Sequence, residues 1–293
     1  MPRLSFVIPT HNRHEMLLAA VASVYAQTLG DWELIVVDDG SAEPVEQALG
    51  SHDQRLIVHR NPSPIGAAAS RNLGARLAKS EFIAFLDDDD TLEPDYASRL
   101  LKLMVEYGEA VGFAWPALRV IDNVKNEESV AQSDPCLISG TTGTEASYVA
   151  SAYTRTTGMM FRTATFRARG GFDESLAVSE DREFVFRLLS EGVGCSSVPD
   201  KLVNFYIHAG PRLSTDANLQ RQAGCDTRVL ERHRAFILSH PRLASRYLNL
   251  VAKRQKLAGW KNDYEKTLKL LLRVRPFDLR AWRRLLLSRL WRS

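Results

Sequence analysis

The sequence predicts an α/β fold, a three-layer sandwich on a mainly parallel sheet, followed by a C-terminal helical region. Short apolar runs alternate with amphipathic helical patterns through the first part of the chain. Such alternation implies right-handed crossovers between parallel strands. From about Ala217 the pattern is helical. We therefore expect an α/β domain over residues 1–215 and a helical region over residues 216–293.

The elements follow from the spacing of apolar side chains. Strands are predicted at 4–8, 33–37, 56–59 and 82–86, where apolar residues run together between turn residues. Helices are predicted between them, because Leu17 and Val21, then Leu73 and Leu77, recur four residues apart. Pro94 suits the start of the next helix. A strand at 157–161 and a helix opened by residues 180–181 are expected after a long polar loop at 122–151.

The most informative segment is the predicted strand that ends in four consecutive acids, 82–90 (FIAFLDDDD). Adjacent carboxylates repel one another, and open α/β sheets bind ligands beyond the carboxyl ends of their strands. A bound Mg²⁺ or Mn²⁺ would relieve the repulsion, because these cations take oxygen ligands and keep positions for substrate phosphates. A solvated acidic turn is the alternative. Two further polar loops, 9–13 (PTHNR) and 38–41 (DDGS), should lie at the same sheet edge.

The composition limits the class of protein. With 45% hydrophobic residues and a net charge of +3, the chain resembles an ordinary soluble protein, and this charge does not favour nucleic acid as a partner. Cys136, Cys195 and Cys225 lack disulfide or metal spacing, so a reducing cytosol is expected. We expect neither a signal peptide nor a membrane-spanning helix, because no apolar run approaches about 20 residues.

Seven motifs in order resemble family 2 glycosyltransferases with the A-type fold. They are VIPTHNR, VVDDGS, GAAASRN, FLDDDD, GGFDES, SEDREFVFRL and YIHAGPRLS, and together they span about residues 3 to 215. Each motif is weak alone, whereas a chance match of all seven at compatible spacing is improbable. The resemblance implies a nucleotide-diphospho-sugar transferase fold, with residues 1–215 as the catalytic domain.

The resemblance also implies a donor site. Asp39 would accept the imide N–H of a uracil, with Asp38 in support, since a charged acceptor strengthens the hydrogen bond. Arg71, at a helix start that favours anions, would contact the phosphates. Turn capping by Asp38 and a surface ion pair for Arg71 are the alternatives. The donor-binding residues expected in these loops are Pro9, Thr10, Asn12, Arg13, Asp38, Asp39 and Arg71.

In the acidic run, the family's D-x-D pattern falls on Asp87 and Asp89. The resemblance implies that Asp89 ligates the metal and that Asp87 faces the ribose hydroxyls, while Asp88 could share either role. His208 would be a second metal ligand, and Ser214 would contact the pyrophosphate. A purely structural histidine is the alternative for His208.

The pair Glu180 and Asp181 would carry the chemistry. In the family pattern Asp181 is the base that takes the acceptor hydroxyl proton, and Glu180 shapes the acceptor site. Adjacent carboxylates raise each other's proton affinity, which suits a base. A helix N-terminus that simply favours acids is the alternative.

These features predict a cytosolic, metal-dependent, inverting glycosyltransferase of hexosyl or N-acetylhexosaminyl type. It would move a sugar from a nucleotide-diphosphate donor, most simply a UDP-sugar, to a glycan or lipid-linked glycan of the cell envelope. A sugar-phosphate nucleotidyltransferase and an inactive sugar-nucleotide-binding protein are the alternatives. No glycine-rich phosphate loop follows Ile8, which disfavours the nucleotidyltransferase and also a dinucleotide-dependent oxidoreductase.

The C-terminal segment is basic, with nine Lys or Arg against one acid from Lys266 to Ser293. Arg283 and Leu286 typify its mixture of arginine with bulky apolar residues, which is common in helices that lie on membranes. Peripheral contact with the inner face of a membrane is one expectation. Packing of this helix on the domain with its arginines outward is the other.

Overall fold

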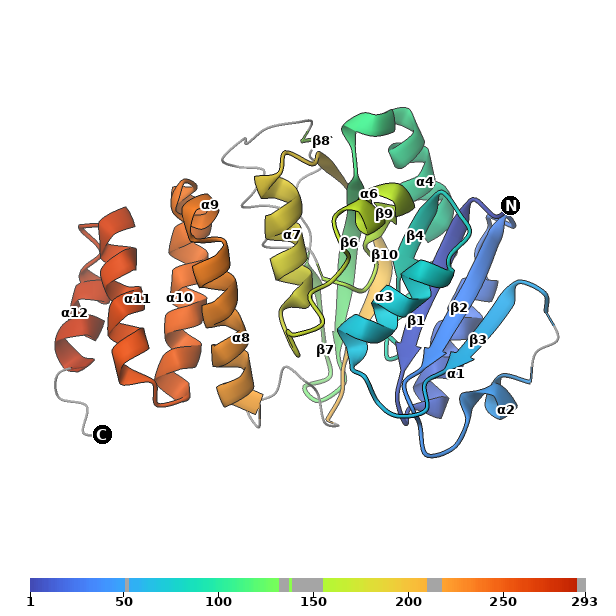
Figure 1. Cartoon of the computed structure of the whole chain (residues 1–293), viewed down its shortest axis with the longest axis horizontal. Coiled ribbons are helices and arrows are strands. Elements are labelled where there is room, and N and C mark those ends of the chain that lie inside the picture. The colour runs from blue at the N-terminus through green and yellow to red at the C-terminus, as the bar shows by residue number, and fades with distance from the viewer. Residues whose placement is uncertain (51–52, 132–136, 139–154, 210–217, 289–293) are drawn as a thin grey trace. The chain divides into compact units, whose positions relative to one another are not determined.

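The computed structural model describes residues 1–50, 53–131, 137–138, 155–209 and 218–288 (Figure 1). By packing they divide into two compact units. The first unit includes residues 1–131, 155–175 and 191–209, and the second includes 176–190 and 218–288. Residues 176–190 therefore pack with the helices beyond residue 215. The predicted boundary at residue 215 divides the chain by sequence order and places these residues in the first domain.

The first unit is built on a mixed sheet in the order β3-β2-β1-β4-β9-β6-β10-β5, with β7 beside β6 and β8 beside β10. Strands β1 to β4 pair in parallel, as predicted, and β6 is parallel to β10. Strand β9 is antiparallel to both β4 and β6. The carboxyl ends of β1, β2, β4 and β10 therefore share one edge. The strands are β1 (Leu4–Thr10), β2 (Trp32–Asp38), β3 (Leu56–Arg60), β4 (Phe82–Phe85), β5 (Thr91–Leu92), β6 (Phe113–Asp122), β7 (Glu127–Ala131), β8 (Leu137–Ile138), β9 (Met160–Arg162) and β10 (Cys195–Ile207).

Helices cover both faces of this sheet, so the predicted three-layer architecture is confirmed. Leu4, Phe6 and Ile8 of β1 share one core with apolar side chains of α1 and α4. The intervening Val7 faces α3, and Figure 1 shows α3 and α6 lying across that face. The helices of this unit are α1 (His14–Tyr25), α2 (Val45–Leu49), α3 (Ala67–Leu77), α4 (Tyr96–Glu106) and α6 (Thr163–Ala168), with a 3₁₀ turn at Gly108–Ala110.

Two long strands beyond residue 110 were not predicted. Strand β6 contains Pro116, and β10 contains Pro199 and shifts register twice against β6. Both features interrupt the apolar run by which a strand is recognised. The polar segment predicted as an irregular loop contains β7, an exposed edge strand. The rest of that loop, 132–136 and 139–154, lies outside the described residues.

The second unit is helical where it is described, in agreement with the sequence pattern. Phe186 of α7 packs in one apolar core with Val229, Tyr247 and Leu268 from three C-terminal helices. No described helix is long and apolar enough to cross a membrane. The helices are α7 (Glu180–Ser190), α8 (Leu219–Arg232), α9 (Arg234–Leu238), α10 (Pro241–Leu257), α11 (Lys261–Val274) and α12 (Leu279–Ser288).

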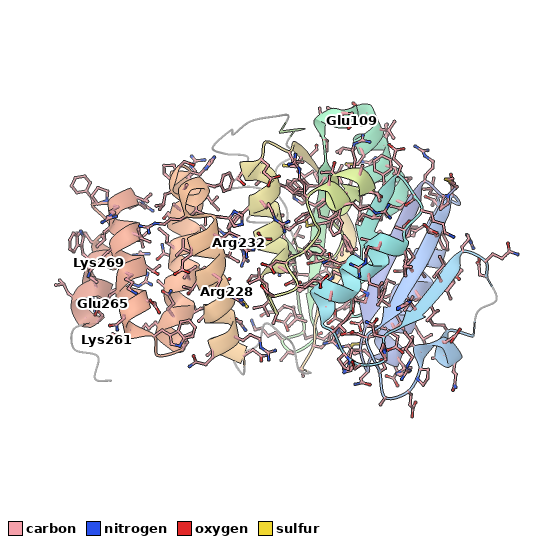
Figure 2. All side chains as sticks on the ribbon, viewed as in Figure 1. Glu109, Arg228, Arg232, Lys261, Glu265 and Lys269 are labelled. Carbon is pink, nitrogen blue, oxygen red and sulfur yellow. The ribbon has the colours of Figure 1, made fainter. Side chains whose placement is uncertain are left out.

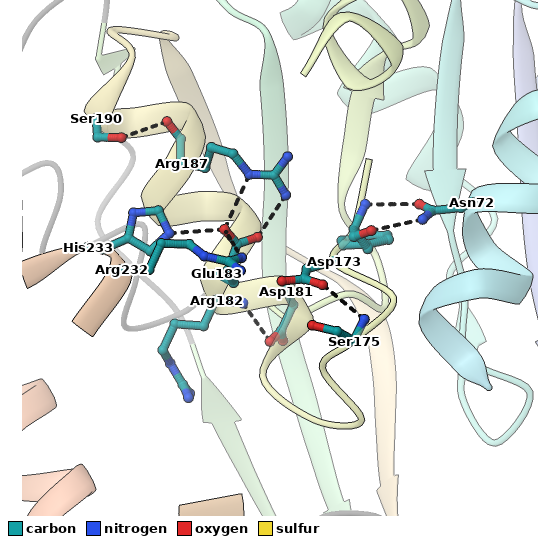
Figure 3. A network of polar contacts seen from close by, with 11 residues as sticks. Asn72, Asp173, Ser175, Asp181, Arg182, Glu183, Arg187, Ser190, Arg232 and His233 are labelled. Carbon is teal, nitrogen blue, oxygen red and sulfur yellow. Dashed lines mark hydrogen bonds and ion pairs between the residues drawn. The ribbon is translucent and has the colours of Figure 1, made fainter. Parts of the chain in front are cut away.

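A buried carboxylate, Glu183, also ties α7 to the helices that follow (Figure 3). Its oxygens lie 2.7 Å from Arg187 Nη2, 3.2 Å from Arg232 Nη1 and 3.0 Å from His233 Nε2. Burial acts to raise the pKa of Glu183, but the hydrogen bonds from His233 and Arg187 outweigh it and lower the pKa to about 2. The charged form is therefore the one that the folded unit holds.

The contact between α3 and β1 can be tested by adding one methyl group. A Cβ at Gly74 would lie 2.3 Å from Val7 Cγ1. Gly→Ala in a helix interior normally stabilises by about 1 kcal/mol, but overpacking costs about 1–3 kcal/mol. We expect Gly74→Ala to lower the free energy of unfolding in urea. Gly30→Ala, whose Cβ would meet nothing within 4 Å, is the control, and unchanged stability of Gly74→Ala would contradict this packing.

The Glu183 network predicts a pH dependence of stability. Because its pKa falls from 4.5 to about 2 on folding, its contribution is present above pH 4.5 and is lost as the pH falls toward 2. We expect Glu183→Gln to cost about 3 kcal/mol at pH 7, the scale for breaking a buried ion pair. The variant should also lose less stability than the wild type between pH 5 and pH 3. Urea unfolding monitored by circular dichroism measures both effects. An equal loss of stability in the variant and the wild type between pH 5 and pH 3 would refute this assignment.

Candidate active site

Loops from β1, β2 and β4, together with the end of β10, meet at one edge of the sheet. Thr10 Oγ1 donates a 2.8 Å hydrogen bond to Asp88 Oδ2, which joins the β1 loop to the acidic run. His208, just after β10, places its Nε2 3.5 Å from the carbonyl oxygen of Asp89. The predicted convergence of the three loops is therefore present in the fold.

The β1 loop is fastened to the turn after β2 by Asn12 and His11. Asn12 adopts a left-handed backbone with φ 56°, and its Oδ1 accepts the N–H of Ala42 at 2.8 Å. Its own N–H donates to Ser41 Oγ at 3.0 Å. His11 Nδ1 lies 2.8 Å from the Asp39 carbonyl oxygen and so carries the proton. Pro9 is buried in β1, paired with β2. The expected base-lining role of Thr10 and Asn12 and the donor-binding role of Pro9 stay predictions.

Asp38 anchors the turn that follows β2. Its buried carboxylate accepts the N–H of Ser41 at 2.8 Å and lies 3.2 Å from Arg60 Nη1. Gly40 follows with φ +71°, and a Cβ there would lie 2.9 Å from the backbone of Pro64. The geometry gives Asp38 the turn-capping role considered as its alternative. Its supporting role toward a nucleobase remains untested.

Asp39 holds the loop that leads into α3. Its carboxylate accepts hydrogen bonds from Asn61 Nδ2 and from the backbone N–H groups of Ile65 and Gly66, each at 2.8 Å. Burial acts to raise the pKa of Asp39, but these donors outweigh it and lower the pKa. The side chain is therefore a preorganised anion at the predicted base-binding position.

The four acids of the β4 end divide into two groups. Asp87, Asp89 and Asp90 present carboxylate oxygens that all lie within 4.8 Å of one another. Asp88 is buried and bonds to Thr10 instead, and burial raises its pKa to about 6 despite the nearby Arg13. Among the described residues, Asp87, Asp89 and Asp90 form the one cluster that could hold a metal ion.

Two arginines neutralise this run. Arg13 Nη1 lies 3.0 Å from both Asp88 Oδ1 and Asp89 Oδ2. Arg71 Nη2 lies 2.5 Å from Asp87 Oδ1, and the Arg71 side chain is only 7% exposed. The Arg71 pair is therefore not the surface ion pair considered as the alternative. Both guanidinium groups lie beside the acidic cluster. Their expected role in binding the donor phosphates stays a prediction.

Asp90 is a candidate site residue that sequence reasoning missed. It is 1% exposed, and its Oδ1 accepts the N–H of Tyr206 at 3.0 Å. Its Oδ2 has no hydrogen-bond partner among the described residues. Burial, together with the charges of Asp87 and Asp89, raises its pKa well above the usual value. An unsatisfied buried carboxylate oxygen in an all-oxygen cluster fits Mg²⁺ or Mn²⁺. The sequence feature that could have identified Asp90 is its place as the fourth acid of FLDDDD.

Of the two late candidate residues, His208 and Ser214, only His208 lies among the described residues. The His208 ring stacks on Tyr206 with centroids 5.9 Å apart, beside the acidic cluster but outside the group of clustered carboxylates. Its metal role stays a prediction. Ser214 lies outside the described residues.

The SRN and GGFDES motifs meet through Asn72, a structural contact that the sequence had not suggested. Asn72 Nδ2 donates to the carbonyl oxygen of Phe172 at 2.8 Å, and Asn72 Oδ1 accepts the N–H of the same residue at 2.9 Å (Figure 3). An amide that pairs with both backbone groups of one residue fixes that turn against α3.

Glu180 and Asp181 begin α7 in the second unit. The preceding Ser179 has a left-handed φ of 66°, and its Oγ donates to Asp226 Oδ1 at 2.8 Å. Arg182 Nη1 lies 3.5 Å from the same carboxylate, which is fully buried. Asp181 Oδ1 accepts the N–H of Arg182 at 2.6 Å. Residues of α8 thus fix the chain that carries the predicted base.

Comparisons with known proteins show that the chain is similar to glycosyltransferases. Residues 5–168, more than half of the chain, match the family model described as glycosyl transferase family 2. An uncharacterized glycosyltransferase of Haemophilus influenzae is 32% identical over 191 residues, which cover 64% of this chain and 62% of that protein. A pre-mycofactocin glycosyltransferase of Mycobacterium tuberculosis is 31% identical over 206 residues, 68% of this chain and 42% of that protein. The chain therefore spans less than two thirds of these relatives.

A third relative is the UDP-Glc:alpha-D-GlcNAc-diphosphoundecaprenol beta-1,3-glucosyltransferase WfgD of Escherichia coli. It is 31% identical over 121 residues, 41% of this chain and 47% of that protein. Among solved structures, TarS residues 1–349 of S. aureus, in complex with UDP-GlcNAc, superimposes with a TM-score of 0.65 at 17% identity. That match covers 98% of this chain and 92% of the other and shows a shared A-type fold. Because the family match takes in the β1 loop, the DDGS turn and the acidic run, the chain belongs to glycosyl transferase family 2.

Proposed function

We propose that the chain is an inverting glycosyltransferase that moves a sugar from a nucleotide-diphosphate donor, most simply a UDP-sugar, to a glycan or lipid-linked glycan. The observation that carries the proposal is the cluster of Asp87, Asp89 and Asp90, with Arg13 and Arg71 beside it. WfgD is named for a UDP-glucose donor and a diphosphoundecaprenol-linked acceptor, and TarS has been solved with UDP-GlcNAc. Both support a UDP-sugar and a transfer of hexosyl or N-acetylhexosaminyl type.

The residues that would hold a divalent cation are Asp89 and its neighbour Asp90, with His208 as a further candidate ligand. A bound Mg²⁺ or Mn²⁺ would neutralise charge on the departing nucleotide diphosphate. Arg13 and Arg71 would exchange part of their pairing with the acids for phosphate oxygens, because guanidinium groups bind both anions well. Asp39, already charged and fixed by three donors, would accept the N–H of the base.

Asp181 is the proposed base. It would take the proton of the acceptor hydroxyl as that oxygen bonds to the anomeric carbon. On the opposite side of that carbon, the bond to the nucleotide diphosphate would break. A positioned general base contributes about 10² to 10⁴ in rate, so the remaining acceleration must come from charge stabilisation of the leaving group. Glu180 would shape the acceptor site.

We place the reaction in the cytosol, at the inner face of a membrane where a lipid-linked acceptor would lie, as a step in polysaccharide synthesis for the cell envelope. A sugar-phosphate nucleotidyltransferase is disfavoured because the loop after β1 reads PTHNR without a glycine-rich phosphate cradle. An inactive nucleotide-binding protein would bind a UDP-sugar without releasing UDP. Slow hydrolysis of the donor separates that alternative from an enzyme.

The acidic cluster predicts that nucleotide binding depends on metal. We expect Mn²⁺ or Mg²⁺ to tighten UDP binding by about 5- to 150-fold, the usual range of coupling between two ligands. Asp89→Ala should abolish this effect, and Asp90→Asn should weaken it. Calorimetry with EDTA, then with added Mn²⁺, measures the dependence. Asp53→Asn, a change to an acid in the loop before β3, is the control. Equal UDP affinity with and without metal in the wild type would disprove the metal assignment.

The base assignment predicts a loss of turnover without a loss of donor binding. We expect Asp181→Asn to lower kcat by about 10² or more, because the base acts only in the transition state. The dissociation constant for the UDP-sugar should move little. Glu180→Gln should be milder, since the base remains. Donor calorimetry beside transfer to an acceptor tests both variants. Retained turnover in Asp181→Asn, or equal losses of rate and donor affinity, would move the base elsewhere.

A further inference from the structure

The helix α12 turns its apolar side chains outward. Its packed side carries Ala281 and Ser288, both buried, and the partly buried Leu285, while four bulky apolar residues of the same helix are exposed. Phe277, just before the helix, is 93% exposed. A helix that packs on a protein core normally buries its apolar stripe, whereas α12 leaves most of its bulky apolar side chains exposed. The exposed residues of the helix are Leu279 (79%), Trp282 (45%), Leu286 (57%) and Leu287 (51%).

Polar contacts fix the helix in this orientation. Arg284 Nη1 donates to Asn249 Oδ1 at 2.6 Å, and its Nε donates to the hydroxyl of Tyr264 at 3.3 Å. Ser288 Oγ donates to Glu265 Oε1 at 2.8 Å, and Figure 2 marks Glu265 on α11. Rolling the leucines inward would break these hydrogen bonds. The outward stripe is therefore a specified feature of the fold.

Positive charge lies among the exposed apolar groups. Arg280 and Arg283 are exposed on α12, and no acid occurs between Leu279 and Ser288. The acid just before the helix, Asp278, accepts the N–H of Ala281 at 3.0 Å and so serves as its cap. The neighbouring α11 adds an exposed Lys269 (Figure 2). The outward surface of α12 is thus apolar and cationic at once.

We propose that this surface, formed by Phe277, Leu279, Arg280, Trp282, Arg283, Leu286 and Leu287, docks on an anionic lipid bilayer with α12 lying in the interface. Leucines and a tryptophan can enter the boundary between headgroups and acyl chains, while arginine stems reach to the anionic headgroups. A second copy of the chain fits less well, because a two-fold contact would bring this cationic surface against itself, and α12 carries no acid to pair with Arg280 and Arg283. The contact requires no turnover, so it can be tested apart from the proposed activity.

Sedimentation of the full chain with vesicles tests the docking surface. We expect binding to vesicles of phosphatidylglycerol and phosphatidylcholine, and little binding to phosphatidylcholine alone. Leu286→Ser with Leu287→Ser should weaken binding about tenfold or more, because buried apolar area sets the affinity. Arg280→Gln with Arg283→Gln should weaken it about 25-fold at low salt, near fivefold for each charge, and should reduce its salt dependence.

Leu18→Ser with Val105→Ser is the matched control, since these apolar residues are 43% and 52% exposed on α1 and α4. Its vesicle binding should equal that of the wild type. All variants should keep the wild-type UDP affinity and circular dichroism. Equal binding to neutral and anionic vesicles would overturn the proposal, as would unchanged binding of both α12 variants. Light scattering can detect a dimer of the wild type. If Leu286→Ser with Leu287→Ser converted that dimer to a monomer, the surface would be assigned to a second copy of the chain instead.

Discussion

Repulsion among four adjacent carboxylates at the end of β4 is the constraint around which the first unit is arranged. The chain meets it in three ways at once. Arg13 and Arg71 approach from two other elements, Asp88 turns away to a hydroxyl, and Asp90 is buried with a raised pKa. Bringing these partners together requires that β1, β4 and α3 end or begin at the same sheet edge. The parallel topology provides this edge.

In the second unit, carboxylates are also neutralised by cationic side chains, and there the carboxylates are fully buried. Glu183 and Asp226 are fully buried carboxylates, and each lies among two or more cationic side chains. Removing one partner of such a group is strongly destabilising, because it leaves an uncompensated buried charge. The left-handed Ser179 is held in place by the same contacts, directly before the acids that would perform the transfer.

The sequence was sufficient for the fold class and for the convergence of the polar loops, because both follow from the order of apolar runs and from the geometry of parallel strands. It could not show β10, in which Pro199 and a shift in register interrupt the pattern. Nor could it show which way each acid of FLDDDD points. Asp88 and Asp90 are each one residue from Asp89, and only the contacts with Thr10 and Tyr206 separate their roles. The outward stripe of α12 was equally hidden, since periodicity shows an apolar face without telling which side is packed.

The interleaving of the two units along the chain has a consequence for dissection of the protein. The first unit is interrupted after residue 175, where the chain forms α7 of the second unit. It resumes at residue 191 and includes β10. A fragment ended at residue 215 would keep the sheet intact in sequence, but its α7 would lack the core that covers Phe186 and would lack Arg232 of α8, which pairs with Glu183. A dissection by chain order would therefore leave the apolar side chain of Phe186 and the charge of Glu183 without their partners from the C-terminal helices. The C-terminal helices must be retained in any minimal version of this protein.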